Sequence, residues 1–251
     1  MTHKKSTPNS NKTDPVILAA AIILIVIMAA CITFLYIRSQ SNSHYQNEGA
    51  GNSEILSTNV KRIVVGSWDG GSISITPHDG DYIILEETAY DGEKIPENEQ
   101  LYYRISGNNL EIKSSLPSVS NMFRGSRPKN LVISIPEDIM FDIVLTPKNT
   151  DIQINEVTGS YFRAEAVNGS VSVNNCSFES VSLSSASGGI SAKGLVCKEL
   201  SCRTLNCSAE VFASINGHLK VETSSGSTLI ETAAFPKSAE ISAINGEVNI
   251  W

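Results

Sequence analysis

The residues of this chain that could perform chemistry are scattered along it rather than gathered into a motif. No nucleophile elbow, phosphate-binding glycine loop or His-Glu-x-x-His pair occurs. Asp79 and Asp81 flank a glycine, but calcium needs more oxygen ligands than two carboxylates supply, so an ordinary turn is favoured. His218 occupies a turn position and is expected to be solvated. We therefore predict no catalytic residue, no cofactor site and no metal site, and no enzymatic activity.

The cysteines offer at most a disulfide. Cys176 and Cys197 stand 21 residues apart, close to the repeat length described below, and an extracellular setting would permit a bridge between them. Stacked unpaired cysteines are the alternative, and the sequence leaves both open. Cys202 falls in an inward-facing column and is expected to pack as a small apolar residue. The spacing of Cys197, Cys202 and Cys207 matches no zinc-binding pattern.

Two insertions interrupt the run of short strands. Residues 89–100 contain four acids and a proline, and residues 114–129 contain two arginines and two prolines. Each is expected to be a solvated loop. The acidic loop has a second interpretation, as a contact surface for a cationic partner.

The elements that would position all these residues come from a repeat. An Asn-Gly pair followed by an apolar–polar–apolar run occurs at residues 167–173, 215–221 and 244–250. Asn-Gly tolerates positive φ and so turns the chain, and the alternation after it is typical of a strand with one buried face. The apolar positions recur at a step of 19 residues, with one inserted residue near the end. They form four columns: Ile133, Ile152, Val171, Ile190, Ala209, Thr228 and Val248; Ile135, Ile154, Val173, Ala192, Val211, Ile230 and Ile250; Ile143, Phe162, Val181, Leu200, Leu219 and Ala239; Leu145, Ala164, Leu183, Cys202, Val221 and Ile241.

A fixed period of about 20 residues is the signature of a solenoid. Two short strands in each copy, with no room for a helix between them, predict an all-β fold: a single-stranded β-solenoid of the β-helix or β-roll kind, with about 19 residues per rung. Side chains in one column would then stack about 4.8 Å apart. The alternative is an antiparallel sandwich of regular hairpins, since Asn-Gly is also a hairpin signal, but it does not explain a repeat of 19 rather than 10.

The outward columns carry no cluster of acids. One of them runs through Glu165, Ser184, Arg203, Glu222 and Ser242. A carbohydrate-cleaving β-helix would place acids on neighbouring rungs of one cleft, whereas alternating charges and hydroxyls are typical of a soluble sheet face. The net charge of −7, and the lack of a basic cluster outside the N-terminus, argue against nucleic acid as a partner.

The N-terminal quarter predicts a membrane anchor. Residues 16–37 form an uncharged apolar segment long enough to span a bilayer as a helix. Lysines precede it and only Arg38 follows closely, so residues 1–15 are predicted to be a cytoplasmic tail. Residues 38–59 read as a flexible stalk, and residues 60–251 as an extracytoplasmic domain. A cleaved signal peptide and a lipoprotein box ending at Cys31 are the rival interpretations.

The strands of the domain resemble a known family. Residues 62–65 (Arg-Ile-Val-Val), 72–77 (Ser-Ile-Ser-Ile-Thr-Pro) and 131–136 (Leu-Val-Ile-Ser-Ile-Pro) precede turn after turn of Asn-Gly or Ser-Gly. This pattern resembles the bacterial putative-adhesin family of β-strand-repeat domains over roughly residues 60–251. The resemblance implies a fold far more than an activity, since the family lacks a well-defined biochemical function, and it supplies no catalytic residues.

We thus expect a single-pass cell-membrane protein that presents a non-catalytic, adhesin-like interaction module outside the cell, with envelope polysaccharide or protein as its partner. The alternative is an envelope signalling or stress-regulatory protein that couples the external domain to a cytoplasmic or membrane partner. The last rung would leave an edge strand open to pairing, so edge-to-edge self-association is also expected.

Overall fold

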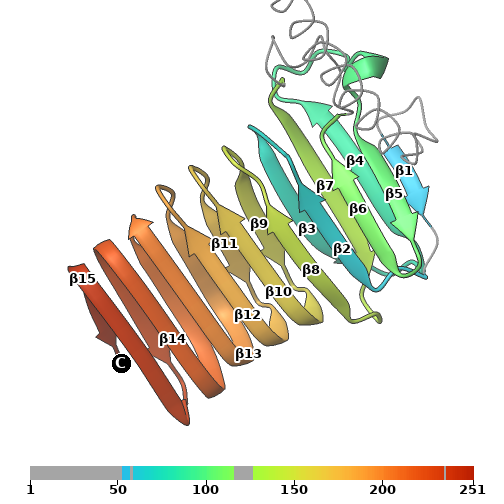
Figure 1. Ribbon diagram of the computed structural model, residues 1–251. Helices are drawn as coiled ribbons and strands as arrows, with labels where there is room; N and C mark the ends of the chain where they lie inside the picture. The colour runs from blue at the N-terminus through green and yellow to red at the C-terminus, as the bar shows by residue number, and fades with distance from the viewer. Residues whose placement is uncertain (1–52, 57–58, 116–126, 235) are drawn as a thin grey trace, which may run out of the picture. The chain divides into compact units, whose positions relative to one another are not determined.

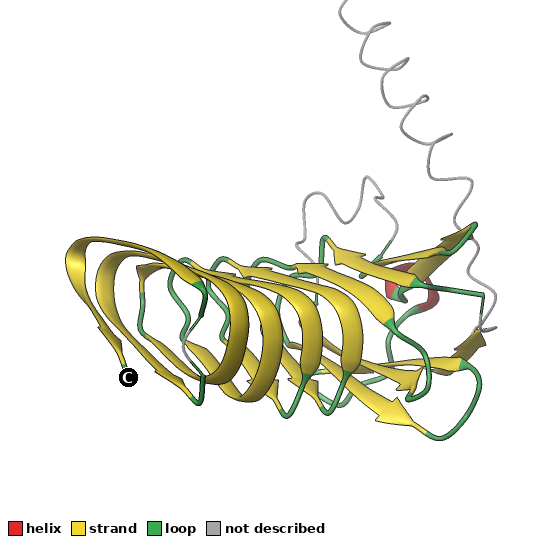
Figure 2. Ribbon diagram, turned by 90° about the horizontal axis from the view of Figure 1, so that it is seen from below, coloured by secondary structure: helices red, strands yellow, loops and turns green. Residues whose placement is uncertain are grey.

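The computed structural model describes residues 53–56, 59–115, 127–234 and 236–251. Within them the chain forms strands and one short 3-10 turn, η1 (Glu97–Glu99), and the strands wind into a flattened coil with two faces (Figures 1 and 2). No helix among these residues is long and apolar enough to cross a membrane. The predicted span at residues 16–37 lies outside the described residues.

Hydrogen-bonded neighbours follow a regular order on each face. The first face contains, in order, β5 (Tyr102–Ser106), β6 (Asn109–Lys113), β2 (Arg62–Gly66), β8 (Phe141–Thr146), β10 (Thr158–Ala166) and β12 (Ser177–Ser185). The second face contains β1 (Ser53–Leu56), β4 (Ile83–Ala89), β7 (Lys129–Pro136), β3 (Ser72–His78), β9 (Asp151–Asn155) and β11 (Val171–Asn174). Three longer strands bend from one face to the other and continue both: β13 (Ile190–Asn206), β14 (Ala209–Thr232) and β15 (Ser238–Ile250).

The predicted stacking is confirmed from β8 onward. Val171 pairs with Ile152 on one side and with Ile190 on the other, in parallel register. On the first face Phe162 pairs with Ile143 and Val181 in the same way. All these side chains are buried, and each buried aliphatic residue contributes about 1.5–3 kcal/mol. The fold is therefore an all-β solenoid of about six turns with about 19 residues per rung.

The predicted stacking of Ile133 on Ile152 is wrong. Strand β3 lies between β7 and β9, so that Ile75 pairs with Ile133 on one side and with Ile154 on the other. On the first face β2 likewise separates β6 from β8. The first rung in the sequence, formed by β2 and β3, therefore lies between the rung of β6 and β7 and the rung of β8 and β9. The unbroken 19-residue repeat starts at β8.

Antiparallel strands cover the end of the solenoid that carries β6 and β7. Strand β4 pairs antiparallel with β7, β5 pairs antiparallel with β6, and β1 pairs antiparallel with β4. Ile95 and Leu101, from the segment between β4 and β5, are buried in the same region. The hairpin of β5 and β6 agrees with the turn signal at residues 107–109, but the place of these strands at the end of the solenoid was not predicted, because alternation shows which face of a strand is buried and not which strand lies beside it.

Glycines recur in one column of equivalent positions on successive rungs: Gly169, Gly188, Gly226 and Gly246, with Cys207 in place of glycine on one rung. Close approach, rather than positive φ, explains the first of them. Gly169 lacks a positive φ, but a Cβ built on it would lie 1.8 Å from the carbonyl oxygen of Thr150 on the preceding rung. Only Gly226 in this column has a φ in the left-handed region, at 109°. The turns therefore stack so closely that the glycine gives room to the backbone of the neighbouring rung.

Candidate functional site

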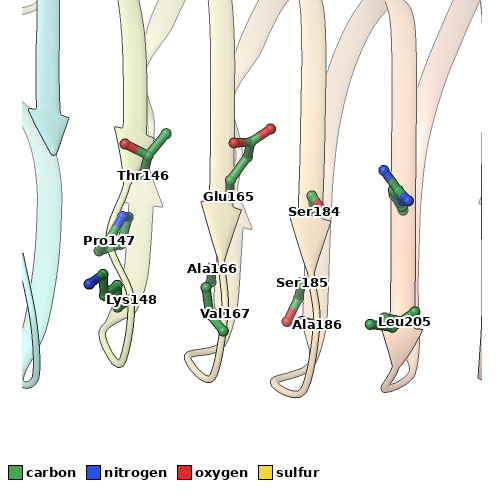
Figure 3. Close-up of a pocket in the computed structure, with 11 residues that line it drawn as sticks. Thr146, Pro147, Lys148, Glu165, Ala166, Val167, Ser184, Ser185, Ala186 and Leu205 are labelled. Atoms are coloured by element: carbon green, nitrogen blue, oxygen red, sulfur yellow. The ribbon is translucent and has the colours of Figure 1, made fainter. Parts of the chain in front are cut away.

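A groove crosses four successive rungs where the first face ends in the turns (Figure 3). Its volume is about 390 Å³. It is lined by Thr146, Pro147, Lys148, Glu165, Ala166, Val167, Ser184, Ser185, Ala186, Arg203 and Leu205. Each rung contributes the same two or three positions, so the groove runs along the stacking direction of the solenoid, across the strands.

One row of the groove consists of polar side chains at the ends of the first-face strands. Ser184 pairs in register with Glu165 on one side and with Arg203 on the other. Thr146 precedes them on β8 (Figure 3). Since neighbouring parallel strands lie about 4.8 Å apart, the carboxylate and the guanidinium originate about 10 Å from each other.

A second row, two residues further along each rung, is apolar for three of its four positions. Val167 is 48% exposed and Leu205 is 44% exposed, with Ala186 between them and Lys148 at the start of the row. Backbone hydrogen bonds hold the row in place: the Val167 amide donates to the Lys148 carbonyl at 3.2 Å, and the Ser187 amide donates to the Val167 carbonyl at 2.9 Å. The apolar side chains face solvent because they lie at or just past the ends of the first-face strands, outside the inward columns.

The charges of the groove are partly engaged. Glu165 accepts a hydrogen bond from Nε of Arg163 at 2.9 Å, and this contact raises the pKa of the Arg163 guanidinium. Arg203 lies 3.6 Å from Glu222 on the next rung, with its side chain 68% exposed. Only one carboxylate lines the groove, so the paired acids of a glycoside hydrolase are not assembled there. The arrangement suits recognition of a long ligand.

A smaller apolar hollow lies on the opposite edge, near the C-terminal rungs. It is lined by Gly194, Leu195, Val196, Phe212, Ala213, Ser214, Glu231, Thr232 and Ala233, and has a volume of about 380 Å³. Glu231 is its one ionisable lining residue.

The residues weighed for chemistry lie apart from the groove. Asp79 and Asp81 are exposed, and the described residues contain no group of three or more His, Cys, Asp or Glu that could hold a metal ion. His218 lies within β14 rather than in the predicted turn and is half-buried, and its Nδ1 lies 2.9 Å from the hydroxyl of Ser238 on the next rung. The absence of catalytic, cofactor and metal sites stays a prediction.

The acidic loop has a cationic partner inside the chain. Arg127, from the second insertion, lies 3.1 Å from Glu93 and 3.7 Å from Asp91. This pairing ties the two insertions together and engages two of the four acids that suggested an external cationic partner.

The four cysteines within the described residues are free thiols. The register places Cys197 beside Phe178 rather than beside Cys176, and Cys176 donates to the Asn174 carbonyl at 3.2 Å. Burial raises the pKa of Cys176, and raises the pKa of both Cys197 and Cys202 to about 12. These thiols are therefore inert packing groups at neutral pH.

The sequence reasoning missed a buried ion pair where the two insertions meet. Nζ of Lys129 donates to Glu87 at 2.8 Å and to the carbonyl of Glu99 at 2.6 Å, and both side chains of the pair are almost fully buried. Nζ also lies 5.3 Å above the ring of Trp68, whose indole N–H donates to the Lys129 carbonyl. Burial lowers the pKa of the Lys129 amine, and the attraction of Glu87 opposes this shift. The cluster is structural, since it is enclosed.

The fold has parallels among solved structures, at low identity. A protein described as a putative adhesin from Bacteroides fragilis is 14% identical, with a TM-score of 0.49, and the match covers 79% of this chain and 96% of that one. A putative cell adhesion protein from Clostridium sporogenes is 11% identical, with a TM-score of 0.36, over 79% and 97% of the two chains. A putative adhesin from Parabacteroides merdae is 12% identical, with a TM-score of 0.35, over 81% and 98%. No curated protein matches the chain.

The family model described as Toastrack DUF4097 matches residues 60–251. The resemblance to a putative-adhesin family of β-repeat domains is thereby confirmed. Because the match extends over well more than half of the sequence, the chain belongs to the Toastrack DUF4097 family.

Proposed function

We propose that this protein is a non-catalytic, adhesin-like interaction module of the cell envelope. Residues 16–37 anchor it in the cell membrane, residues 1–15 lie in the cytoplasm, and residues 60–251 lie outside. The long uncharged segment and its flanking lysines support the anchor and its orientation. Family membership is consistent with an adhesin-like role without naming a ligand.

The groove across four rungs carries this proposal. It offers a ledge of Val167, Ala186 and Leu205 beside a row of polar groups, repeated at the spacing of the strands. Such a surface matches an extended polymer that lies along the solenoid and repeats its own groups at a similar interval. Lys148 and Arg203 outnumber Glu165 in the groove, although the whole chain has a net charge of −7. The ligand class is therefore an envelope polysaccharide with carboxylate or phosphate groups.

The test is binding of the purified full chain, in detergent micelles, to immobilised anionic wall polymers and neutral glycans. Arg203→Glu and Leu205→Asp are each expected to weaken binding to the anionic polymer about tenfold or more, since an unpaired charge is placed where contact is made. Lys193→Glu, on an exposed residue outside the groove, is the matched control and should bind like the parent. Equal binding by all variants would show that the groove is not the binding site. Shortening of the polymer during the assay would overturn the proposed non-catalytic role.

The anchor is tested separately in membranes. The chain should stay in the membrane fraction after alkaline carbonate washing, and a protease added outside intact cells should remove residues 60–251. Release of the chain by the wash, or protection of the domain from the protease, would contradict the proposed topology.

A further inference from the structure

The two ends of the solenoid differ in how well their apolar interior is covered. At the β6–β7 end, antiparallel strands extend both faces beyond the last parallel strands, and the edge strands β1 and β5 are only four and five residues long. At the other end, β15 pairs with β14 alone among the described strands (Figure 1). Its 13 residues leave a long edge of backbone N–H and C=O groups with which no other described strand pairs.

Ala239 and Ile241, which belong to the inward columns of β15, are open to solvent, while Val248 and Ile250 are half-buried. Ile241 pairs with Val221 and is 53% exposed, whereas Val221 is 1% exposed. Ile244 and Trp251, on the same rung, are 74% and 70% exposed. We call Ala239, Ile241, Ala243, Val248 and Ile250, with their backbone edge, the open end. A β-strand that also carries apolar side chains would pair this backbone edge and cover these side chains at the same time.

We propose that the open end pairs with the open end of a second copy of this chain, to give a closed two-fold dimer. Head-to-tail stacking is disfavoured, because the opposite end is covered by antiparallel strands and the buried Ile95 and Leu101. Pairing of like ends closes the assembly after two copies.

The sequence of β15 is self-complementary in one antiparallel register. With Ile241 opposite its own copy, Ala239 faces Ala243 and Glu240 faces Ser242, so apolar meets apolar and the two carboxylates avoid each other. A register centred on Glu240 would set two carboxylates directly opposite and is disfavoured. On the second face, a centre at Asn249 sets Val248 opposite Ile250.

The experiment is sedimentation velocity of the full chain in detergent micelles over a wide concentration range. The parent is expected to form a dimer, and Ile241→Lys to raise its dissociation constant at least tenfold. Ile105→Lys, at a residue of β5 that is 42% exposed, is the matched control and should leave the dimer intact. Fluorescence of the buried Trp68, in a Trp251→Phe background, checks that each variant is folded.

Oxidative cross-linking tests the register. In a background with Cys31→Ser and Cys207→Ser, the Ile241→Cys chain should form a disulfide-linked dimer, while Glu240→Cys should cross-link at least tenfold more slowly. A parent chain that stays monomeric at every concentration overturns the proposal. This is the result expected if another segment of the chain, or another protein, covered the open end. Loss of the dimer in Ile105→Lys, or faster cross-linking at Glu240→Cys, overturns it as well. None of these readouts depends on polymer binding.

Discussion

Removing the amine of Lys129 should lower the free energy of unfolding more than the loss of a surface ion pair does. In Lys129→Met the buried carboxylate of Glu87 loses the ammonium 2.8 Å away, and the carbonyls of Glu99 and Ser114 lose their donor. Glu87 keeps the hydrogen bond from the Leu101 amide, at 2.9 Å. Breaking a buried ion pair in this way costs about 3–5 kcal/mol, because one charge stays buried without its partner.

Urea unfolding followed by the fluorescence of Trp68 measures this cost. Trp68 is 1% exposed and contacts Lys129, so it reports on the same end, and Trp251→Phe removes the second indole. With a slope of about 2 kcal/mol per molar urea, the midpoint should fall by about 1.5–2.5 M. The double variant Lys129→Met with Glu87→Leu should recover at least half of that loss, since no charge is left buried.

The control is Arg163→Gln, which removes an exposed ion pair with Glu165 and should change the free energy of unfolding by less than about 1 kcal/mol. A midpoint for Lys129→Met within about 0.5 M of the parent would refute the reasoning. A double variant as unstable as the sum of its single changes would also refute it, because the two residues would then not act as a pair.

Three further expectations follow from the stacked rungs. Gly188→Ala should cost more than about 2 kcal/mol by urea unfolding, because its Cβ would lie 2.0 Å from the Gly169 carbonyl oxygen, whereas Gly189→Ala, whose nearest contact is 3.8 Å, should be tolerated. Burial raises the folded-state pKa of Cys202 from about 9 to about 12, so the stability it contributes is complete below pH 9 and is lost as the pH rises towards 12. Cys202→Ala should therefore flatten the alkaline loss of stability by up to about 1.4 kcal/mol per pH unit, and an unchanged slope in alkaline unfolding curves would count against this. Phe162→Ala should cost about 3–5 kcal/mol by urea unfolding, because the ring is fully buried and its centroid lies 5.4 Å from that of Phe178; a cost under 1 kcal/mol would contradict the stacking.

The period of 19 residues was enough to predict which residues stack from β8 onward, because each rung repeats the same inward positions. It could not reveal the interposed rung. Ile73 and Ile75 of β3 offer the same apolar pair as Leu131 and Ile133 of β7, and nothing in either pair marks which neighbour it takes. Order along the stack is decided by the connections between rungs, which leave no periodic signal.

The buried ion pair did leave a signal in the sequence. The alternation of β4 places Glu87 in line with the inward Leu85, and that of β7 places Lys129 in line with the inward Leu131. Two opposite charges at inward positions of strands predict a pair. The groove left a weaker signal in the sequence. Its polar row lies in a predicted outward column, but the exposure of Val167 and Leu205 depends on how the turns stack.

The interposed rung has a consequence for the order in which the molecule can assemble during synthesis. Strands β2 and β3 leave the ribosome early, yet β3 obtains its parallel partners only when β7 and β9 exist, and β2 only when β6 and β8 exist. About 155 residues must therefore be made before the first rung is enclosed on both sides. The rungs from β8 onward pair with one another, and only β8 and β9 also pair with the early strands β2 and β3. Folding can therefore start in these later rungs, and the first-synthesised rung is completed by strands made after it.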